Sequence, residues 1–173
     1  MTTVFGCDQR ISKSSAIAEA LGALDETNSF LGLCKVHEKA VDYKLSDASF
    51  SEIIHNTQQN LFIIQAELAG AQKSISEDKI KEIEKIIDAM EKELPLIKTF
   101  FISGGTELSA LFDVVRTIAR RAERRVVEVS EEGKQKISEN SLAYLNRLSS
   151  LLYALARLTN HKSGITEQIP DYQ

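Results

Sequence analysis

Five long stretches of the sequence repeat apolar residues at intervals of three and four, which is the period of one face of an α-helix. With only 8 glycines and 2 prolines in 173 residues, the chain has few of the turn residues that a fold of many short strands needs. The spacing predicts helices over about 14–37, 47–72, 76–94, 108–130 and 138–160. The expected fold class is therefore all-α.

Polar breaks of a few residues separate the five segments, and short connections place successive helices side by side and antiparallel. We therefore expect a five-helix antiparallel bundle, ferritin-like in architecture, formed by a single domain over residues 1–173. Residues 1–13 and 161–173 lie outside the periodic segments and are expected to be extensions of the bundle. The pattern "SISE" at 74–77 predicts a capping box where the third helix begins.

Composition and charge limit the classes of function. The net charge is −4, whereas general nucleic-acid binding needs a basic surface, so no nucleic-acid partner is expected. No apolar run approaches the roughly 20 residues that span a bilayer, and the first ten residues do not have the pattern of a secretory signal. Cys7 and Cys34 do not form a disulfide framework or a metal motif, and His37, His55 and His161 are too dispersed for a metal site. These features predict a cytoplasmic protein with reduced thiols and no membrane partner.

One segment departs from the acidic average of the chain. The ten residues from 116 to 125, "RTIARRAERR", contain five arginines. At about 100° per residue, Arg116, Arg120 and Arg124 fall on one stripe of the helix. Arg121 and Arg125 fall on a second stripe. Three of the possible pairs are four residues apart, and like charges at that spacing destabilise an isolated helix.

Two interpretations of this cluster stay open on the residues alone. In the first, the arginines form a solvated helix face, with stems that cover apolar surface and guanidinium groups that pair with carboxylates. In the second, a strongly anionic partner compensates the like charges, because the planar guanidinium group matches phosphate and carboxylate oxygens. A polyphosphate and the carboxylates of another subunit would both fit.

Three segments together resemble one enzyme family, the PduO-type ATP:cob(I)alamin adenosyltransferases. They are "FGCDQRISKSSAIAEALGALDETNSFLGL" at 5–33, "SGGTELSALFDVVRTIARRAERRVV" at 103–127 and "YLNRLSSLLYALAR" at 144–157. The resemblance implies a five-helix bundle assembled as a homotrimer, with active sites between subunits. It also implies transfer of the 5′-deoxyadenosyl group of ATP to cob(I)alamin or a related corrinoid, giving adenosylcobalamin and triphosphate.

The same resemblance implies a set of ATP-binding residues in this chain. They are Thr2, Thr3, Lys13, Arg120, Arg121, Glu123, Arg124 and Asn146. Thr2 and Thr3 match the end of a nucleotide-binding loop, and Lys13 matches a phosphate-binding lysine. Lys13, Arg120 and Arg124, with Mg²⁺ on the phosphates, would stabilise the negative charge of the departing triphosphate.

Two further residues take catalytic roles from the resemblance. Phe100 matches a phenylalanine beneath the corrin ring, where an apolar side chain excludes water and the lower ligand of cobalt, although its neighbour Phe101 could take this place. Without the resemblance, "FFI" at 100–102 would be interpreted as core. Asp25 matches an aspartate that pairs with an arginine of the "RRAER" helix across the subunit interface. Asn28, which is polar in an apolar stripe, is interpreted as a core residue hydrogen-bonded to a neighbouring helix, and a place in the ligand site is the alternative.

The chain also departs from the family pattern. A "TGDxG"-like glycine loop is expected before Thr2, but Met1 stands there, "SGG" at 103–105 replaces "PGG", and Thr27 replaces a leucine. The first departure favours an alternative function, which is a non-catalytic ATP or corrinoid carrier with the same fold. The expected partners are ATP, a corrinoid, further copies of the chain, and a reductase or a cobalamin-dependent enzyme.

Overall fold

Six α-helices account for most of the residues described in the computed structural model, which are 2–4, 10–97 and 99–172. The helices are α1 (Ala16–Lys35), α2 (Glu38–Asp42), α3 (Phe50–Leu68), α4 (Glu77–Glu93), α5 (Glu107–Glu131) and α6 (Glu139–Lys162). Two short antiparallel hairpins join β1 (Thr2–Val4) to β2 (Arg10–Ser12) and β3 (Lys44–Leu45) to β4 (Ala48–Ser49). The all-α class is confirmed.

The five long helices match the five predicted segments, but α2 has no counterpart in the predicted five-helix count. The α2 helix and the β3–β4 hairpin lie between residues 38 and 49, which are too few for a helical period to appear in the sequence. Ser46, at the turn of the hairpin, has a φ of 53°, in the left-handed region that favours glycine. The α2 helix and the β3–β4 hairpin together form the connection between α1 and α3.

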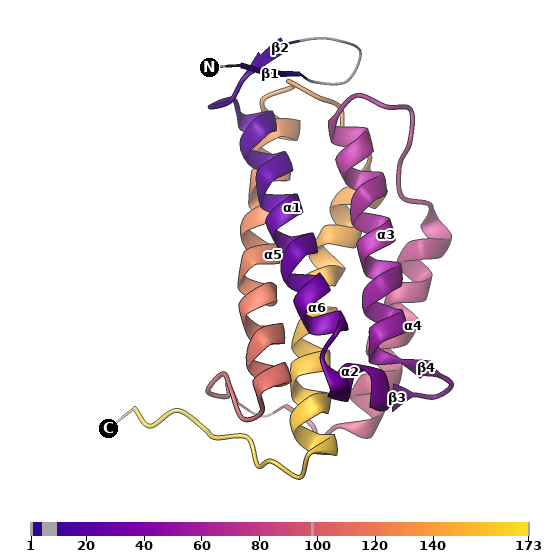
Figure 1. The fold of residues 1–173 in the computed structure, drawn as a ribbon, viewed down its shortest axis with the longest axis vertical. Coiled ribbons are helices and arrows are strands. Elements are labelled where there is room, and N and C mark those ends of the chain that lie inside the picture. Colours follow the sequence, from indigo (N-terminus) through magenta and orange to yellow (C-terminus); the bar gives the residue numbers. More distant parts are fainter. Residues whose placement is uncertain (1, 5–9, 98, 173) are drawn as a thin grey trace.

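The long helices run alternately up and down the bundle, as Figure 1 shows. The α1 helix packs against α3 and α5, and α6 packs against α4 and α5. The β1–β2 hairpin lies at the same end of the bundle as the α5–α6 connection, whereas the α4–α5 connection and the C-terminal segment lie at the opposite end (Figure 1). The bundle therefore separates the N-terminal hairpin from the loop that contains Phe100.

Hydroxyl side chains fix where four of the long helices begin. Each accepts a hydrogen bond from the backbone N–H three residues later, which satisfies a donor that has no partner within the helix. These N-cap residues are Ser15, Ser49, Thr106 and Ser138. Ser49 forms a capping box with Glu52. Ser76, before α4, makes no such bond, so the predicted capping box at 74–77 is wrong.

The predicted apolar faces form one core. Leu61, Val115 and Leu152 have no exposed surface, and residues 154–160 of α6 are buried on every side of the helix. Because α6 packs against α4 and α5 and the C-terminal segment covers its end, its last turns have little contact with water. No helix in the described ranges is both long and apolar enough to cross a membrane.

Asn28 is buried, as predicted, but its side chain does not make the predicted bond. Its Oδ1 atom has no hydrogen-bond partner among the described residues. The contact between α1 and α3 at this point uses the backbone oxygen of Asn28, which accepts from Gln58 Nε2 at 3.1 Å. Asn28 therefore places a buried side-chain oxygen without a hydrogen bond in the apolar stripe of α1.

Candidate active site

A glycine turn fixes the loop at the foot of the candidate site. Gly104 and Gly105 have φ values of 123° and 105°, which side chains rarely adopt. A Cβ atom on Gly105 would overlap the side chain of Asn160, whose Oδ1 accepts from Thr106 N at 3.1 Å and whose Nδ2 donates to Gly104 O at 2.8 Å. Asn160 thus ties the start of α5 to the end of α6, and this holds residues 99–103 beside both helices.

A cavity of about 620 Å³ opens between the α4–α5 connection and the lower halves of α5 and α6. This volume lies within the roughly 300–1,000 Å³ range of small-molecule sites. Its apolar lining includes Ile97, Phe100, Phe101, Ile102 and Tyr153, and its charged lining includes Asp113, Arg116, Arg120, Arg157 and Glu167. Phe100 is 78% exposed at this cavity, so the interpretation of "FFI" as plain core does not hold for Phe100.

Charged and aromatic groups form one wall of the cavity. Arg116 Nε donates to Asp113 Oδ1 at 3.2 Å, and the guanidinium carbon of Arg116 lies 5.8 Å from the centroid of the Tyr153 ring. Burial raises the pKa of Tyr153 above its usual value, and the positive charge of Arg157 opposes the shift. Tyr153 is therefore a neutral hydroxyl donor among the charged groups of this wall.

The arginines of α5 differ in whether they have a partner within the chain. Arg121 Nη2 donates to Glu26 on α1, and Arg125 Nη1 donates to Glu128 Oε2 at 2.9 Å. Arg120 and Arg124 are exposed and make no hydrogen bond or ion pair within the described part of the chain. The two interpretations of the cluster therefore apply to different residues, because only Arg120 and Arg124 keep their charge available.

A second, smaller cavity of about 300 Å³ lies between α5 and α6, and its lining comprises Arg120, Glu123, Arg124, Val127, Glu128, Glu131 and Asn146. Asn146 Nδ2 donates to Glu123 Oε1 at 3.0 Å, so the amide and the carboxylate hold one another in place. Arg120 borders both this cavity and the larger one. Four of the predicted ATP-binding residues thus come together, whereas Arg121 faces a third hollow beside Glu26.

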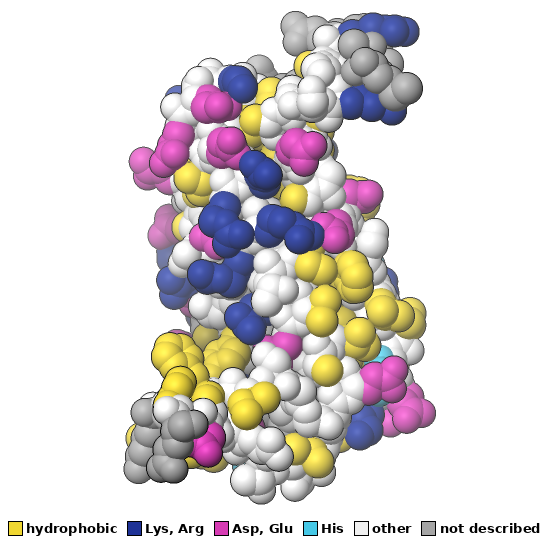
Figure 2. All heavy atoms as spheres, turned by 90° about the vertical axis from the view of Figure 1, so that its left-hand side faces the viewer, with side chains coloured by type: hydrophobic (Ala, Val, Ile, Leu, Met, Phe, Trp, Pro, Cys, Tyr) yellow, Lys and Arg dark blue, Asp and Glu magenta, His cyan; other side chains and the backbone are white. Residues whose placement is uncertain are grey.

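Figure 2 shows a band of Lys and Arg side chains across the middle of one face of the molecule, with acidic side chains above and beside it and apolar side chains below and beside it. A surface with this much positive charge attracts anions in spite of the net charge of −4, because potentials near a surface depend on local charges. Within the described ranges, no group of three or more His, Cys, Asp or Glu side chains is placed to bind a metal.

The other predicted residues lie apart from this band within one chain. Lys13 is exposed in the turn between β2 and α1, and the backbones of Thr2 and Thr3 pair with Ser12 and Ile11 at the end of the bundle. Asp25 is exposed on α1 and has no hydrogen bond or ion pair among the described residues. Cys7 and Met1 lie outside the described residues. Within one chain, the structure therefore does not bring the whole predicted set of ATP-binding and catalytic residues together.

Sequence reasoning missed several residues of the larger cavity, among them Tyr153, Arg157 and Glu167. One signal was present, because Arg157 is the only charged residue in the apolar run "LLYALARL" at 151–158. A charge in such a run requires a buried partner or a ligand. No periodic pattern marked Glu167, which follows the last helix.

Comparisons with known proteins relate the chain to one family. A family model described as cobalamin adenosyltransferase matches residues 1–159. The corrinoid adenosyltransferase of Bacillus subtilis is 37% identical over 90% of this chain and 80% of its own length. The corrinoid adenosyltransferase PduO of Citrobacter freundii is 36% identical over 92% of this chain, which spans 47% of that protein.

A solved structure shares the fold. A variant of the PduO-type ATP:corrinoid adenosyltransferase from Lactobacillus reuteri, complexed with cobalamin and ATP, superposes with a TM-score of 0.87 at 28% identity. The match covers 98% of this chain and 93% of that one. The chain therefore belongs to the cobalamin adenosyltransferase family. It spans about half the length of the PduO proteins of Citrobacter freundii and Salmonella typhimurium.

Proposed function

We propose that this protein transfers the 5′-deoxyadenosyl group of ATP to cob(I)alamin or a related corrinoid, forming adenosylcobalamin and releasing triphosphate. The observation that carries the proposal is the position of Arg120, a guanidinium group without a partner in the described chain that borders both cavities. A reaction between two large substrates needs such a junction, where the reacting atoms of both can meet. The family match and the relatives named above support the same reaction.

In this proposal the smaller cavity binds the nucleotide. Arg120 and Arg124 hold the triphosphate, because two guanidinium groups without carboxylate partners can donate to phosphate oxygens at little cost. Glu123 and Asn146 are already joined at 3.0 Å and offer acceptors and donors to the sugar or the base. ATP arrives with Mg²⁺ on its phosphates. Arg121 would have to leave Glu26 to reach the same ligand.

We propose that the rest of the nucleotide site comes from a second copy of the chain, in a homotrimer. Lys13 and the strand that contains Thr2 and Thr3 lie at the end of the bundle, and Asp25 makes no hydrogen bond or ion pair with Arg120 or Arg124 within one chain, although the family resemblance assigns all of them to the same site. Exposed apolar side chains support a contact between subunits here, and they include Leu33 on α1, Val36 directly after α1, and Val114 on α5. Asp25 of one subunit would pair with Arg120 or Arg124 of the next.

The larger cavity would take the corrinoid, with Phe100 beneath the ring. An exposed phenylalanine at the mouth of a cavity can displace water and a nitrogen ligand from the lower face of cobalt. Removal of that ligand makes reduction to cobalt(I) easier, because an electron pair from the ligand no longer raises the energy of the orbital that is filled. A reductase would supply the electron, and we place the reaction in the cytoplasm.

The chemical step needs no nucleophile from the protein. The cobalt(I) electron pair attacks C5′ of ATP, the cobalt–carbon bond forms, and the bond between C5′ and the phosphate oxygen breaks with its electron pair on triphosphate. Charge accumulates on the leaving group, and preorganised guanidinium groups stabilise it there. Arg120, Arg124 and Lys13 are the proposed donors for this charge. Asp25 would keep its arginine partner correctly oriented.

An anaerobic assay with chemically reduced cobalamin and MgATP tests the proposal. The expected result is a cobalt–carbon bond, detected by the light-sensitive absorption spectrum of adenosylcobalamin, with one triphosphate released per turnover. A carrier of the same fold would bind ATP or the corrinoid without forming this product. A purely structural bundle would give no heat of ATP binding in calorimetry at near-physiological salt. Either of these two results would contradict the proposed reaction.

A further inference from the structure

A buried arginine lies behind the wall of the larger cavity and joins three parts of the chain. Arg157 of α6 is 4% exposed, and its Nε donates to both carboxylate oxygens of Glu167 at 3.1 and 3.0 Å. Its Nη2 donates to Pro95 O at 3.1 Å. Its guanidinium carbon also lies 5.1 Å from the centroid of the Phe101 ring. A single side chain thus contacts the C-terminal segment and both ends of the 95–101 stretch.

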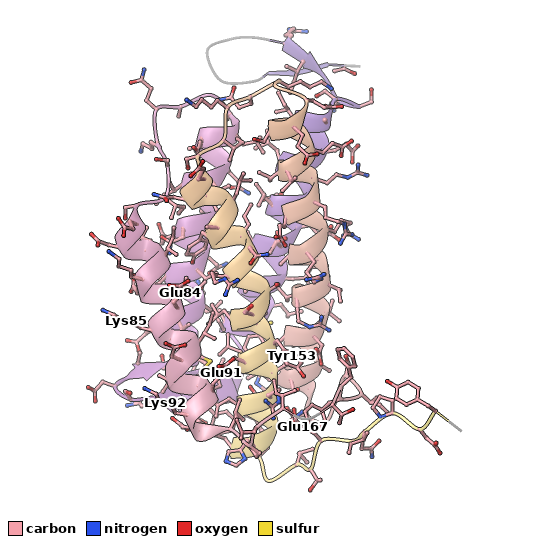
Figure 3. All side chains as sticks on the ribbon, turned by 180° about the vertical axis from the view of Figure 1, so that it is seen from behind. Glu84, Lys85, Glu91, Lys92, Tyr153 and Glu167 are labelled. Carbon is pink, nitrogen blue, oxygen red and sulfur yellow. The ribbon has the colours of Figure 1, made fainter. Side chains whose placement is uncertain are left out.

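Glu167 belongs to a segment without regular structure that follows α6 and crosses the foot of the bundle, which we call the C-terminal strap (residues 163–172). Figure 3 shows Glu167 on this strap, at the end of the bundle where Tyr153 lies on α6. The contacts that hold the strap include three hydrogen bonds to other parts of the chain. Its first residue, Ser163, shares a hydrogen bond of 2.8 Å with the Tyr43 hydroxyl, Glu167 accepts from Arg157, and Gln168 O accepts from Ile102 N at 2.8 Å.

These contacts hold the two residues that follow Phe100 but not Phe100 itself. Phe101 lies against the guanidinium group of Arg157, and Ile102 is bonded through its backbone to the strap. Phe100 makes no ring contact or hydrogen bond within the described residues and is 78% exposed. Its placement in the cavity therefore depends on how firmly the following two residues are held.

We propose that Arg157 and Glu167 are positioning residues, which set the location of Phe100 in the corrinoid site by holding the C-terminal strap against the α4–α5 connection. This inference rests on the proposed function. The pair contacts neither the proposed nucleotide cavity nor its arginines, because it lines only the larger cavity. Its loss should therefore affect the corrinoid and leave ATP binding unchanged.

The buried geometry makes the pair sensitive to small changes. A hydrogen bond to a charged group contributes about 1.5–3 kcal/mol, and an unpaired buried charge is costly. Glu167→Gln keeps the size of the side chain but removes the charge that attracts Arg157. Arg157→Lys keeps a positive charge but loses the planar group that spans Glu167, Pro95 and Phe101. Both variants are expected to loosen the strap without emptying the core.

The experiment compares these variants with Glu93→Gln, a matched control. Glu93 accepts from Lys162 Nζ at 2.8 Å, so this variant also removes an ion pair at the foot of the bundle, but Glu93 does not line the cavity. For each protein we would measure the KM for corrinoid and for ATP, the thermal midpoint, and the electron paramagnetic resonance spectrum of bound cob(II)alamin with ATP present. Nitrogen splitting in that spectrum reports the lower ligand still on cobalt.

For Glu167→Gln and Arg157→Lys, we expect the KM for corrinoid to rise about tenfold, with the KM for ATP unchanged and the nitrogen splitting partly restored. Glu93→Gln should match the wild type. If the variants match Glu93→Gln, or weaken ATP and corrinoid equally, the positioning role is wrong. If the wild-type chain itself forms no adenosylcobalamin, the proposed function fails first, and the positioning role fails with it.

Discussion

Two pairs of arginines on one helix face different surroundings. Arg121 and Arg125 each donate to a glutamate of the same chain, on α1 or on α5. Arg120 and Arg124, on the adjacent stripe, have no partner among the described residues and line a cavity between α5 and α6. The four side chains lie within six consecutive positions of the sequence. Residue type and spacing therefore do not distinguish a solvated ion pair from a ligand site.

The difference follows from the packing of α5. Its apolar face turns toward α1 on one side and α6 on the other, so arginines on either side of that face meet different neighbours. The α1 side supplies Glu26, which neutralises Arg121. The α6 side supplies Asn146, which donates to Glu123. Glu128 and Glu131 line the same cavity, but neither Arg120 nor Arg124 forms an ion pair within the described chain. Available positive charge remains on the side of α5 that faces α6, and we propose the nucleotide there.

The largest expected effect concerns the two arginines of α5 that have no ion-pair partner in the described chain. Arg120→Ala and Arg124→Ala should each lower kcat by about 10²–10³-fold, because a donor to the leaving-group charge is lost. Circular dichroism and the thermal midpoint should change little, since both side chains are exposed and make no bond in the described chain. The anaerobic adenosylation assay measures the effect. Wild-type turnover in both variants would remove these arginines from the mechanism.

A second prediction compares two neighbouring acids on α1. Asp25→Asn should weaken trimer assembly and lower activity by roughly tenfold to a hundredfold, because removing one partner of a desolvated ion pair leaves the other charge unpaired. Glu26→Gln, the matched control, removes only the half-exposed pair with Arg121. Sedimentation velocity and the same activity assay provide the two measurements. Equal behaviour of the two variants would argue against an interfacial role for Asp25.

A third prediction concerns the stability of the fold and leaves the arginines of α5 unchanged. Gly105→Ala should destabilise the fold by about 1–2 kcal/mol, because alanine does not favour a φ of 105° and its Cβ would displace Asn160. Gly133→Ala is the control for the backbone conformation, since its φ is 65° but no atom lies near the added Cβ. Chemical denaturation should give the larger loss for Gly105→Ala, and equal losses would exclude the contact with Asn160.

The smallest expected effect concerns an arginine of α5 that pairs with a glutamate of the same chain. Arg125→Gln should change the free energy of unfolding by no more than about 0.5 kcal/mol, because exposed ion pairs contribute little. Activity should stay within about threefold of the wild type, as expected for a surface substitution away from the reacting groups. Urea denaturation and steady-state kinetics measure the two quantities. A loss of activity as large as that of Arg124→Ala would erase the difference between the two sides of α5.

Local patterns predicted the long helices well, since Leu145, Leu148 and Leu155 repeat at the helical period and lie in the core as expected. The grouping of Arg120, Glu123, Arg124 and Asn146 also agrees with the predicted ATP set. The pairing of Arg121 with Glu26 was not predicted, because it depends on how α1 packs against α5 rather than on spacing along either helix. The roles of all these residues stay predictions.

Contacts between segments that are distant in the sequence and have no periodic pattern could not be predicted from the sequence. Arg157 was visible as a lone charge in an apolar run, but its partner Glu167 lies beyond the last helix, where no pattern fixes the path of the chain. Similarly, Gly104 and Gly105 lie in the break between the third and fourth predicted helices, but the conformation of this turn depends on the side chain of Asn160, more than fifty residues later. Tertiary packing alone brings these groups together.

A crystal structure of the assembled protein with ATP would test the central claim most directly. The account predicts triphosphate oxygens within hydrogen-bonding distance of the guanidinium groups of Arg120 and Arg124, with Lys13 of a neighbouring subunit on the same phosphates. Arg121 and Arg125 would keep their glutamate partners. Phosphates bound elsewhere, with Arg120 and Arg124 still directed into solvent, would contradict it.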